Sequence, residues 1–174
     1  MESQVLYRAA FQFQWHWLVI PALLIASAII AIHFMKKVRE AKESGQTKDV
    51  VGSYVAMAVG LSGVSFLLFV TAILIPAKIG EYHATIGAFE KGEYEIVEGY
   101  VEDFHPMAYT GHGDYETFRI NDVTFSYSDY VDCFGYHTSR FHGGVITGDG
   151  QHLKIGYTTY GSYGNIIVYI EELP

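Results

Sequence analysis

The chain has 174 residues, half of them hydrophobic, and a formal net charge of −8. This length fits one ordinary domain, or a small domain with a membrane anchor. The single cysteine, Cys133, excludes an internal disulfide, and the acidic balance argues against nucleic-acid binding, which depends on neutralising phosphates.

Two long apolar runs dominate the N-terminal half of the chain. Residues 18–35 contain His33 as their one ionisable side chain, and residues 55–77 contain none. Each run has the length of a membrane-spanning helix, about 18 to 25 residues. We therefore predict a two-helix transmembrane hairpin within residues 1–78, with helices at about 17–35 and 53–77. The alternative, two buried helices of a soluble bundle, would require a polar edge that both runs lack.

Basic residues predict the orientation of this hairpin. Five of them lie in the loop 36–49, whereas Arg8 is the only one before the first run. The positive-inside rule places such a loop in the cytoplasm. We expect both termini on the other side of the membrane, outside the inner membrane if the source is a bacterium, although Lys78 at the membrane edge argues the other way.

Aromatic residues of the N-terminal arm indicate contact with lipid headgroups. Amphipathic rings gather at the membrane–water interface, and we expect Trp15 and Trp17 to lie there together with Tyr7, Phe11 and Phe13.

Small residues predict where the two helices meet. Gly52, Ala56 and Gly60 recur every four residues in the second run, and Ala22 and Ala26 share that spacing in the first. Such residues let two backbones approach closely in lipid. We expect these five residues to pack the hairpin. A second set could equally contact a second chain: Ser62, Gly63 and Ser65.

Beyond residue 78 the pattern changes from apolar runs to short segments with turn signals. Residues 79–92 are typical of a helical connector that Gly92 ends. Residues 93–174 contain β-rich segments, with Asn121 and Asp122 as a tight hairpin turn. We expect strands at 94–104, 115–120, 123–127, 130–136, 145–147, 152–160 and 165–172.

The expected fold class is membrane α + β, a transmembrane hairpin followed by a small antiparallel β-barrel. So few strands are short of a β sandwich, and a flat sheet would expose long edges that a closed or partly open barrel removes. An OB-like barrel is the first choice and an SH3-like barrel the second. The expected core consists of Ile96, Val101, Phe104, Phe118, Ile120, Val123, Phe125, Val145, Leu153, Ile155, Ile167, Val168 and Ile170.

Four segments of the β-rich part carry a resemblance. They are IVEGYV, TFRINDVTFSY, HGGVITGDGQHLKIGY and IIVYIEE. Together with the hairpin, they resemble a group of uncharacterised bacterial membrane proteins that join a transmembrane hairpin to a small β-barrel. This architecture is similar to that of the NfeD-like proteins, whose extramembrane part is an OB barrel. The resemblance implies no catalytic residue.

A loop rich in histidine and carboxylate is the candidate chemical site. A zinc site needs three or four converging ligands, and His105, His112 and Asp114 could supply them from one loop. No HExxH or paired CxxC motif accompanies them. Cys133 has no histidine at a recognisable catalytic spacing, so we expect it to be a structural thiol.

The sequence favours a non-enzymatic accessory or scaffold protein of the membrane. Residues 79–174 hold fifteen Asp or Glu against four Lys or Arg, a balance of −11, which excludes nucleic acid as a partner. We expect contact with membrane lipid and either self-association or a membrane-protein partner, with no cofactor. The alternative is a metal-binding or hydrolytic extracytoplasmic domain that uses His105, His112 and Asp114.

Overall fold

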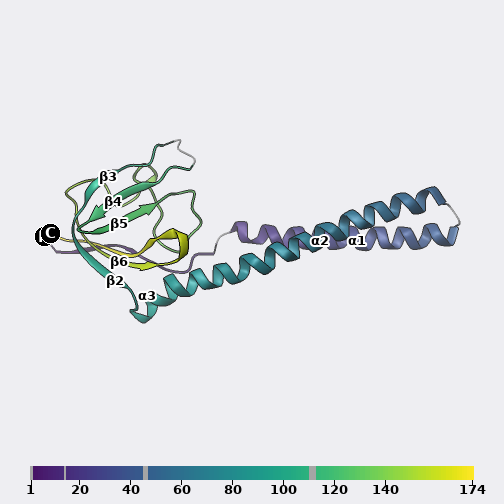
Figure 1. Cartoon of the computed structure of the whole chain (residues 1–174), viewed down its shortest axis with the longest axis horizontal. Helices are drawn as coiled ribbons and strands as arrows, with labels where there is room; N and C mark the ends of the chain where they lie inside the picture. Colours follow the sequence, from purple (N-terminus) through teal and green to yellow (C-terminus); the bar gives the residue numbers. More distant parts are fainter. Residues whose placement is uncertain (1, 14, 45–46, 110–112) are drawn as a thin grey trace. The chain divides into compact units, whose positions relative to one another are not determined.

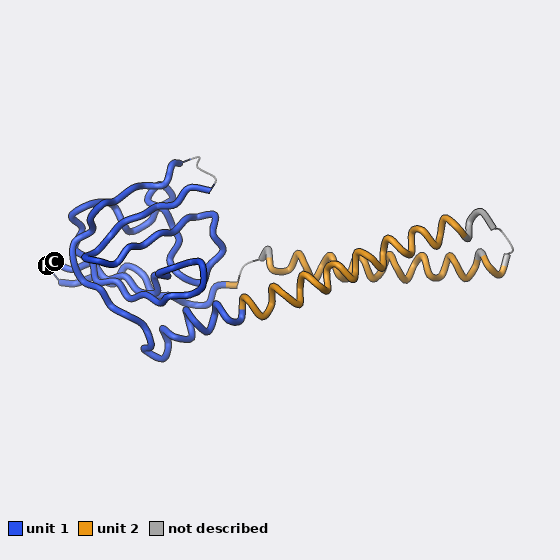
Figure 2. The backbone as a smooth tube through the Cα atoms, in the orientation of Figure 1, with its two compact units in different colours: residues 1–12, 79–174 blue, residues 13–78 orange. Residues whose placement is uncertain are grey.

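The chain divides into two compact units. A computed structural model describes residues 2–13, 15–44, 47–109 and 113–174, without the side chains of residues 15–16, 41, 44 and 47–50. The helical unit comprises residues 13–78, and the β unit comprises residues 1–12 together with 79–174 (Figure 2). The first twelve residues, expected as an arm beside the hairpin within residues 1–78, group with the β unit.

The helical unit is formed by two long helices, α1 (Val19–Ser44) and α2 (Thr47–Tyr82), after a 3-10 turn at Trp15–Leu18 (Figure 1). Both contain segments long and apolar enough to span a membrane, within Val19–Glu40 and Val51–Lys91, and only 6% of the most apolar part of each is buried. Apolar helices inside a soluble core would be mostly buried. At 1.5 Å per residue, each helix exceeds the roughly 30 Å of a bilayer's hydrocarbon core.

The two helices lie close together at Gly60. A Cβ added to Gly60 would lie 3.5 Å from both Cα and Cβ of Ala31, which is only 4% exposed. One turn along, a Cβ at Gly63 would lie 3.8 Å from Oγ of Ser27. A Cβ at position 60 would therefore be in ordinary van der Waals contact with α1.

The other small residues expected at this contact do not all reach it. A Cβ at Gly52 would have nothing within 4 Å, Ala56 is partly buried, and Ala22 and Ala26 are exposed. Successive residues are rotated by about 100° around a helix, so eight residues displace Gly52 by about 80° from Gly60. Ala22 lies about 180° away from Ala31 by the same rule. A spacing of four does not hold one face over several turns.

The β unit contains a four-stranded and a three-stranded antiparallel sheet, which are not closed into a barrel. The four-stranded sheet has the order β1-β7-β6-β2 and the three-stranded sheet has the order β3-β4-β5 (Figure 1). The strands are β1 (Gln4–Arg8), β2 (Glu95–Tyr100), β3 (Glu102–His105), β4 (Glu116–Ile120), β5 (Val123–Tyr127), β6 (His152–Thr159) and β7 (Asn165–Glu172).

Three differences from the expected strands explain why the barrel prediction fails. The segment expected as one strand at 94–104 is two strands, β2 and β3, which belong to different sheets. The strands expected at 130–136 and 145–147 do not form, and these residues lie in irregular turns with a 3-10 turn at Arg140–His142. The N-terminal arm supplies β1 instead, pairing Tyr7 with Ile170 and Arg8 with Tyr169.

The main core lies between the two sheets. Phe118 and Phe125 stack with ring centroids 5.0 Å apart, and both are at most 1% exposed. Most of the expected core residues are buried, but Ile96 is 55% exposed and its neighbour Val97 points inward instead. A second cluster joins Ala9, Ile86 and Val168 on the other face of β7.

The connector 79–92 is helical, as expected, and runs through a π-helical turn at His83–Gly87 into α3 (Ala88–Lys91). Gly92 ends it with a φ of 75°. Glu81, near the end of α2, is 2% exposed and its Oε1 accepts a hydrogen bond from the main-chain N–H of Phe134 at 2.9 Å.

Candidate functional site

A cavity of about 450 Å³ opens in the β unit where the sheets fail to close. Its wall combines the end of β5, the loop 128–137 and the beginning of β7. The side-chain Nδ2 of Asn165 donates a hydrogen bond to the Thr124 carbonyl at 3.0 Å and so bridges β7 and β5 beside the cavity. The volume falls in the range of ligand pockets, roughly 300–1,000 Å³. Among its lining residues are Tyr115, Ser126, Cys133, Tyr136, His137 and Tyr163.

The loop on the cavity wall lies directly against β7. The N–H of Tyr136 donates to the Ile167 carbonyl at 2.8 Å, and Tyr136 Oη accepts a hydrogen bond from Val145 N–H at 2.7 Å. At Gly135 a Cβ would lie 2.1 Å from Ile166 Cγ2 and 2.9 Å from the Ile167 oxygen. Glycine is therefore required for the loop to approach the strand.

Cys133 and His137 meet on this wall, a pairing that sequence reasoning missed. Sγ of Cys133 lies 3.8 Å from Nδ1 of His137, which is also 2.9 Å from the Gly135 carbonyl. A carbonyl only accepts, so Nδ1 carries its proton and cannot take one from the thiol. In this geometry the two side chains form a polar part of the cavity lining and do not act as a nucleophile with its base. The spacing of four residues between Cys133 and His137 was the only sequence feature that could have indicated this contact.

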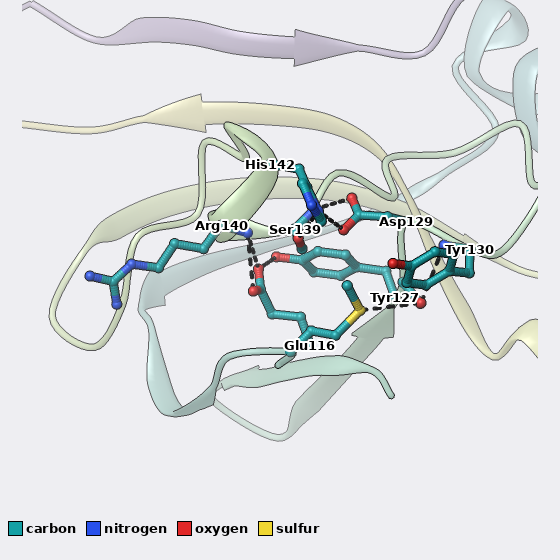
Figure 3. A network of polar contacts seen from close by, with 9 residues as sticks. Glu116, Tyr127, Asp129, Tyr130, Ser139, Arg140 and His142 are labelled. Carbon is teal, nitrogen blue, oxygen red and sulfur yellow. Dashed lines mark hydrogen bonds and ion pairs between the residues drawn. The ribbon is translucent and has the colours of Figure 1, made fainter. Parts of the chain in front are cut away.

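A buried carboxylate anchors the neighbouring turn. Glu116 is fully buried, and its Oε1 accepts a hydrogen bond from Tyr127 Oη at 2.5 Å (Figure 3). The N–H of Arg140 reaches both carboxylate oxygens at 3.1 and 3.2 Å. Burial and the hydrogen bond to Glu116 raise the pKa of Tyr127 well above its usual value. The network holds β4, β5 and the 139–142 turn together, so its role is structural.

Asp129, Ser139 and His142 have the composition of a catalytic triad but not its geometry (Figure 3). Asp129 Oδ2 lies 2.6 Å and Ser139 Oγ 3.2 Å from the same ring nitrogen, Nδ1 of His142. A triad places the serine and the carboxylate on opposite nitrogens of the imidazole. Burial alone would raise the pKa of Asp129, but hydrogen bonds from Ser139 and His142 outweigh it and lower that pKa.

The expected metal ligands are only partly described. His105, at the end of β3, is exposed and its Nδ1 lies 2.8 Å from the Asp103 carbonyl oxygen. Asp114 is exposed in the following loop, and His112 lies outside the described residues. Within the described ranges no group of three or more His, Cys, Asp or Glu could hold a metal ion. The metal site stays a prediction.

The N-terminal aromatic residues divide between the two units. Tyr7 packs edge-on against Tyr136 inside the β unit, with ring centroids 5.1 Å apart, and its expected place at a lipid interface stays a prediction. The rings of Trp17 and Phe13 lie with their centroids 5.9 Å apart in the helical unit. The side chain of Trp15 lies outside the described residues.

Comparison of the chain with protein-family models, with curated proteins and with solved structures finds no match.

Proposed function

We propose that the chain is a two-pass integral membrane protein that holds its β unit at the membrane surface as an accessory or scaffold for a partner. One observation carries this proposal. Strand β1 precedes both helices, β7 follows them, and the two strands pair in one sheet. A chain that leaves a folded unit and returns to it crosses a membrane an even number of times. Two spans satisfy this condition.

The hydroxyl groups of α2 support a lipid environment. Oγ of Ser62 donates to the Ala58 carbonyl at 2.8 Å, and Oγ1 of Thr71 donates to the Leu67 carbonyl at 2.7 Å. Polar groups in hydrocarbon need such internal partners, because no water is available there. The basic segment 36–49 was expected to be a loop, but its described residues belong to the end of α1 and the beginning of α2. This segment would then face the cytoplasm and the β unit would lie outside it, at a bacterial inner membrane.

The partner is a protein or another ligand rather than nucleic acid, because residues 79–174 carry a balance of −11. We propose that the chain shares with the NfeD-like proteins only the general arrangement of a hairpin joined to a small antiparallel β unit. The polar side chains of the β unit hydrogen-bond within their own clusters, Tyr127 with Glu116 and His142 with Asp129. Such internally bonded groups suit a binding surface better than a reaction centre.

Topology is tested with single cysteines in a Cys133→Ser background. We expect Glu2→Cys and Pro174→Cys to react alike with a membrane-impermeant maleimide in spheroplasts. Ser44→Cys should react only after the membrane is opened. Labelling of Glu2→Cys and Pro174→Cys on opposite sides would overturn the two-pass arrangement.

The accessory role is tested by photo-cross-linking in native membranes. A photo-reactive residue replacing Tyr163, at the cavity, should yield a defined cross-linked product that the same residue replacing Tyr100, on exposed β2, does not yield. Equal products at both positions would count against a partner at the cavity. Stoichiometric zinc or copper in the purified protein would instead favour the metal-binding alternative that uses His105, His112 and Asp114.

A further inference from the structure

We propose that the opening between β5 and β7 binds an extended, basic peptide segment as an additional strand on β5. This inference rests on the proposed function and deepens it, since it names the kind of partner that the β unit holds.

The first argument is that β5 has one unpaired edge. It is the outer strand of the order β3-β4-β5. Ile120 and Val123 face each other across the two-residue turn, and this closing pair is hydrogen-bonded in such hairpins. Because antiparallel strands alternate hydrogen-bonded and non-bonded pairs, the main-chain groups of Phe125 also point toward β4. Those of Thr124 and Ser126 point the other way, toward the cavity side.

The contact of Asn165 confirms this direction independently. The Thr124 carbonyl receives its hydrogen bond from the Asn165 side chain, which occupies the place that a neighbouring strand would take. Ser126 is the next residue on the same edge and lines the cavity. Within the described part of the chain, no hydrogen bond outside the β4–β5 ladder reaches its main chain. The cavity therefore offers one N–H and one C=O to an occupant with a matching edge.

The wall chemistry specifies the occupant's side chains. Tyr115, Tyr136 and Tyr163 line the cavity, and aromatic faces accept apolar groups and cations. The described lining residues include no Lys, Arg, Asp or Glu, and the β-rich part that surrounds the cavity carries a strong negative balance. Lysine or arginine alternating with apolar residues therefore complements the tyrosine faces of the lining and the negative charge of the surrounding unit. A nucleic acid would be repelled, and a compact small molecule would make no use of the edge of Ser126.

The experiment uses the full-length protein in detergent micelles. The probe is a fluorescent octapeptide of alternating lysine and valine, and its affinity is measured by anisotropy. One comparison peptide has the same sequence with N-methyl groups along one edge, which removes its main-chain donors there. A second comparison peptide replaces lysine with glutamate. We expect the first probe to bind and both comparison peptides to bind at least about tenfold more weakly.

The matched protein variants are Ser126→Pro and Ser126→Ala. Proline removes only the N–H that faces the cavity side, a substitution that edge strands tolerate, whereas alanine keeps that N–H. We expect Ser126→Ala to bind the probe like the wild type and Ser126→Pro to bind it at least about tenfold more weakly. Circular dichroism and thermal unfolding check that Ser126→Pro remains folded, and the N-methylated peptide tests the same hydrogen bonds without any mutation.

Three outcomes would overturn the inference: no binding of the lysine–valine peptide, equal binding of its N-methylated form, or equal binding by Ser126→Pro and Ser126→Ala. Absence of peptide binding would favour a small molecule as the occupant of the cavity. Equal binding of the N-methylated peptide, or equal binding by the two Ser126 variants, would indicate that the peptide is held by its side chains alone. The topology labelling is independent of these results. If the labelling fails but the peptide binds, only the two-pass membrane arrangement is overturned. If the labelling succeeds but the peptide does not bind, only the peptide site is overturned.

Discussion

Glu81 and Phe134 join the end of α2 to the loop on the cavity wall, through a 2.9 Å hydrogen bond from the Phe134 N–H to the buried Glu81 carboxylate. The ring of Tyr82 meets Phe134 edge-on at 5.7 Å beside this bond. Both neighbours of Phe134 in the sequence, Cys133 and Gly135, belong to the loop that lies against β7. The position of this loop thus depends on the last turn of α2.

Replacing Glu81 with alanine should weaken this junction. The change leaves the Phe134 N–H without its carboxylate partner in a partly buried place, which costs about 1–3 kcal/mol. We expect a lower unfolding temperature and faster amide exchange at Phe134. Glu81→Gln is the matched control, because its amide oxygen can still accept the bond. If the Phe134 amide exchanged at the wild-type rate in both variants, the hydrogen bond to Glu81 would not stabilise the loop.

Replacing Gly135 with alanine should disturb the cavity wall. The added methyl would overlap Ile166 Cγ2 and the Ile167 oxygen, and overpacking of this kind costs about 1–3 kcal/mol. Gly87→Ala is the control, because its Cβ would meet no atom closer than 3.5 Å and its backbone is helical. Thermal unfolding should separate the two variants, and equal stabilities would contradict the close approach of the loop to β7.

Cysteines at positions 31 and 60 should form a disulfide within one chain. The Cβ positions lie 3.5 Å apart, at the short end of the range for disulfides. We expect Ala31→Cys with Gly60→Cys, in a Cys133→Ser background, to cross-link rapidly under mild oxidation. Ala31→Cys with Gly52→Cys is the control and should stay reduced, since nothing lies within 4 Å of Gly52. The readout is gel mobility with and without reductant.

Asp129 should make stability depend on pH in the acidic range. Its pKa is lower in the folded protein than in the unfolded chain, because Ser139 and His142 bond to the carboxylate despite its burial. The stabilisation is therefore complete above the unfolded value of about 3.9 and is lost as pH falls through the folded pKa.

Asp129→Asn should accordingly be less stable than the wild type at pH 7, by about 1–2 kcal/mol, and this gap should shrink as pH is lowered below about 4. Denaturant unfolding at several pH values measures it. Asp122→Asn, which removes a carboxylate from the exposed hairpin turn, is the control for general charge effects. A gap that did not change with pH would show that the carboxylate charge is not what stabilises the turn.

Local patterns predicted those features that depend on residues close in sequence. The apolar runs indicated α1 and α2, Gly92 indicated the end of the connector, and Asn121 and Asp122 indicated the turn between β4 and β5. Each depends on helical period, chain length or turn chemistry within a few residues. Most of the core was also readable, because buried strand positions are rich in isoleucine, valine and phenylalanine.

Pairing between distant segments could be decided only by the tertiary structure. The sequence of β1 is short and has one aromatic residue, Tyr7, which suits a lipid interface as well as a strand until it is placed opposite Ile170. That pairing, the unclosed seam at Thr124 and Asn165, and the meeting of Cys133 with His137 all require contacts that no local period specifies. The sequence by itself determined two apolar helices, a hairpin turn and an acidic, β-rich remainder. Only the tertiary structure decided that the first and last strands share one sheet, because that choice depends on which distant edges bury the most surface together.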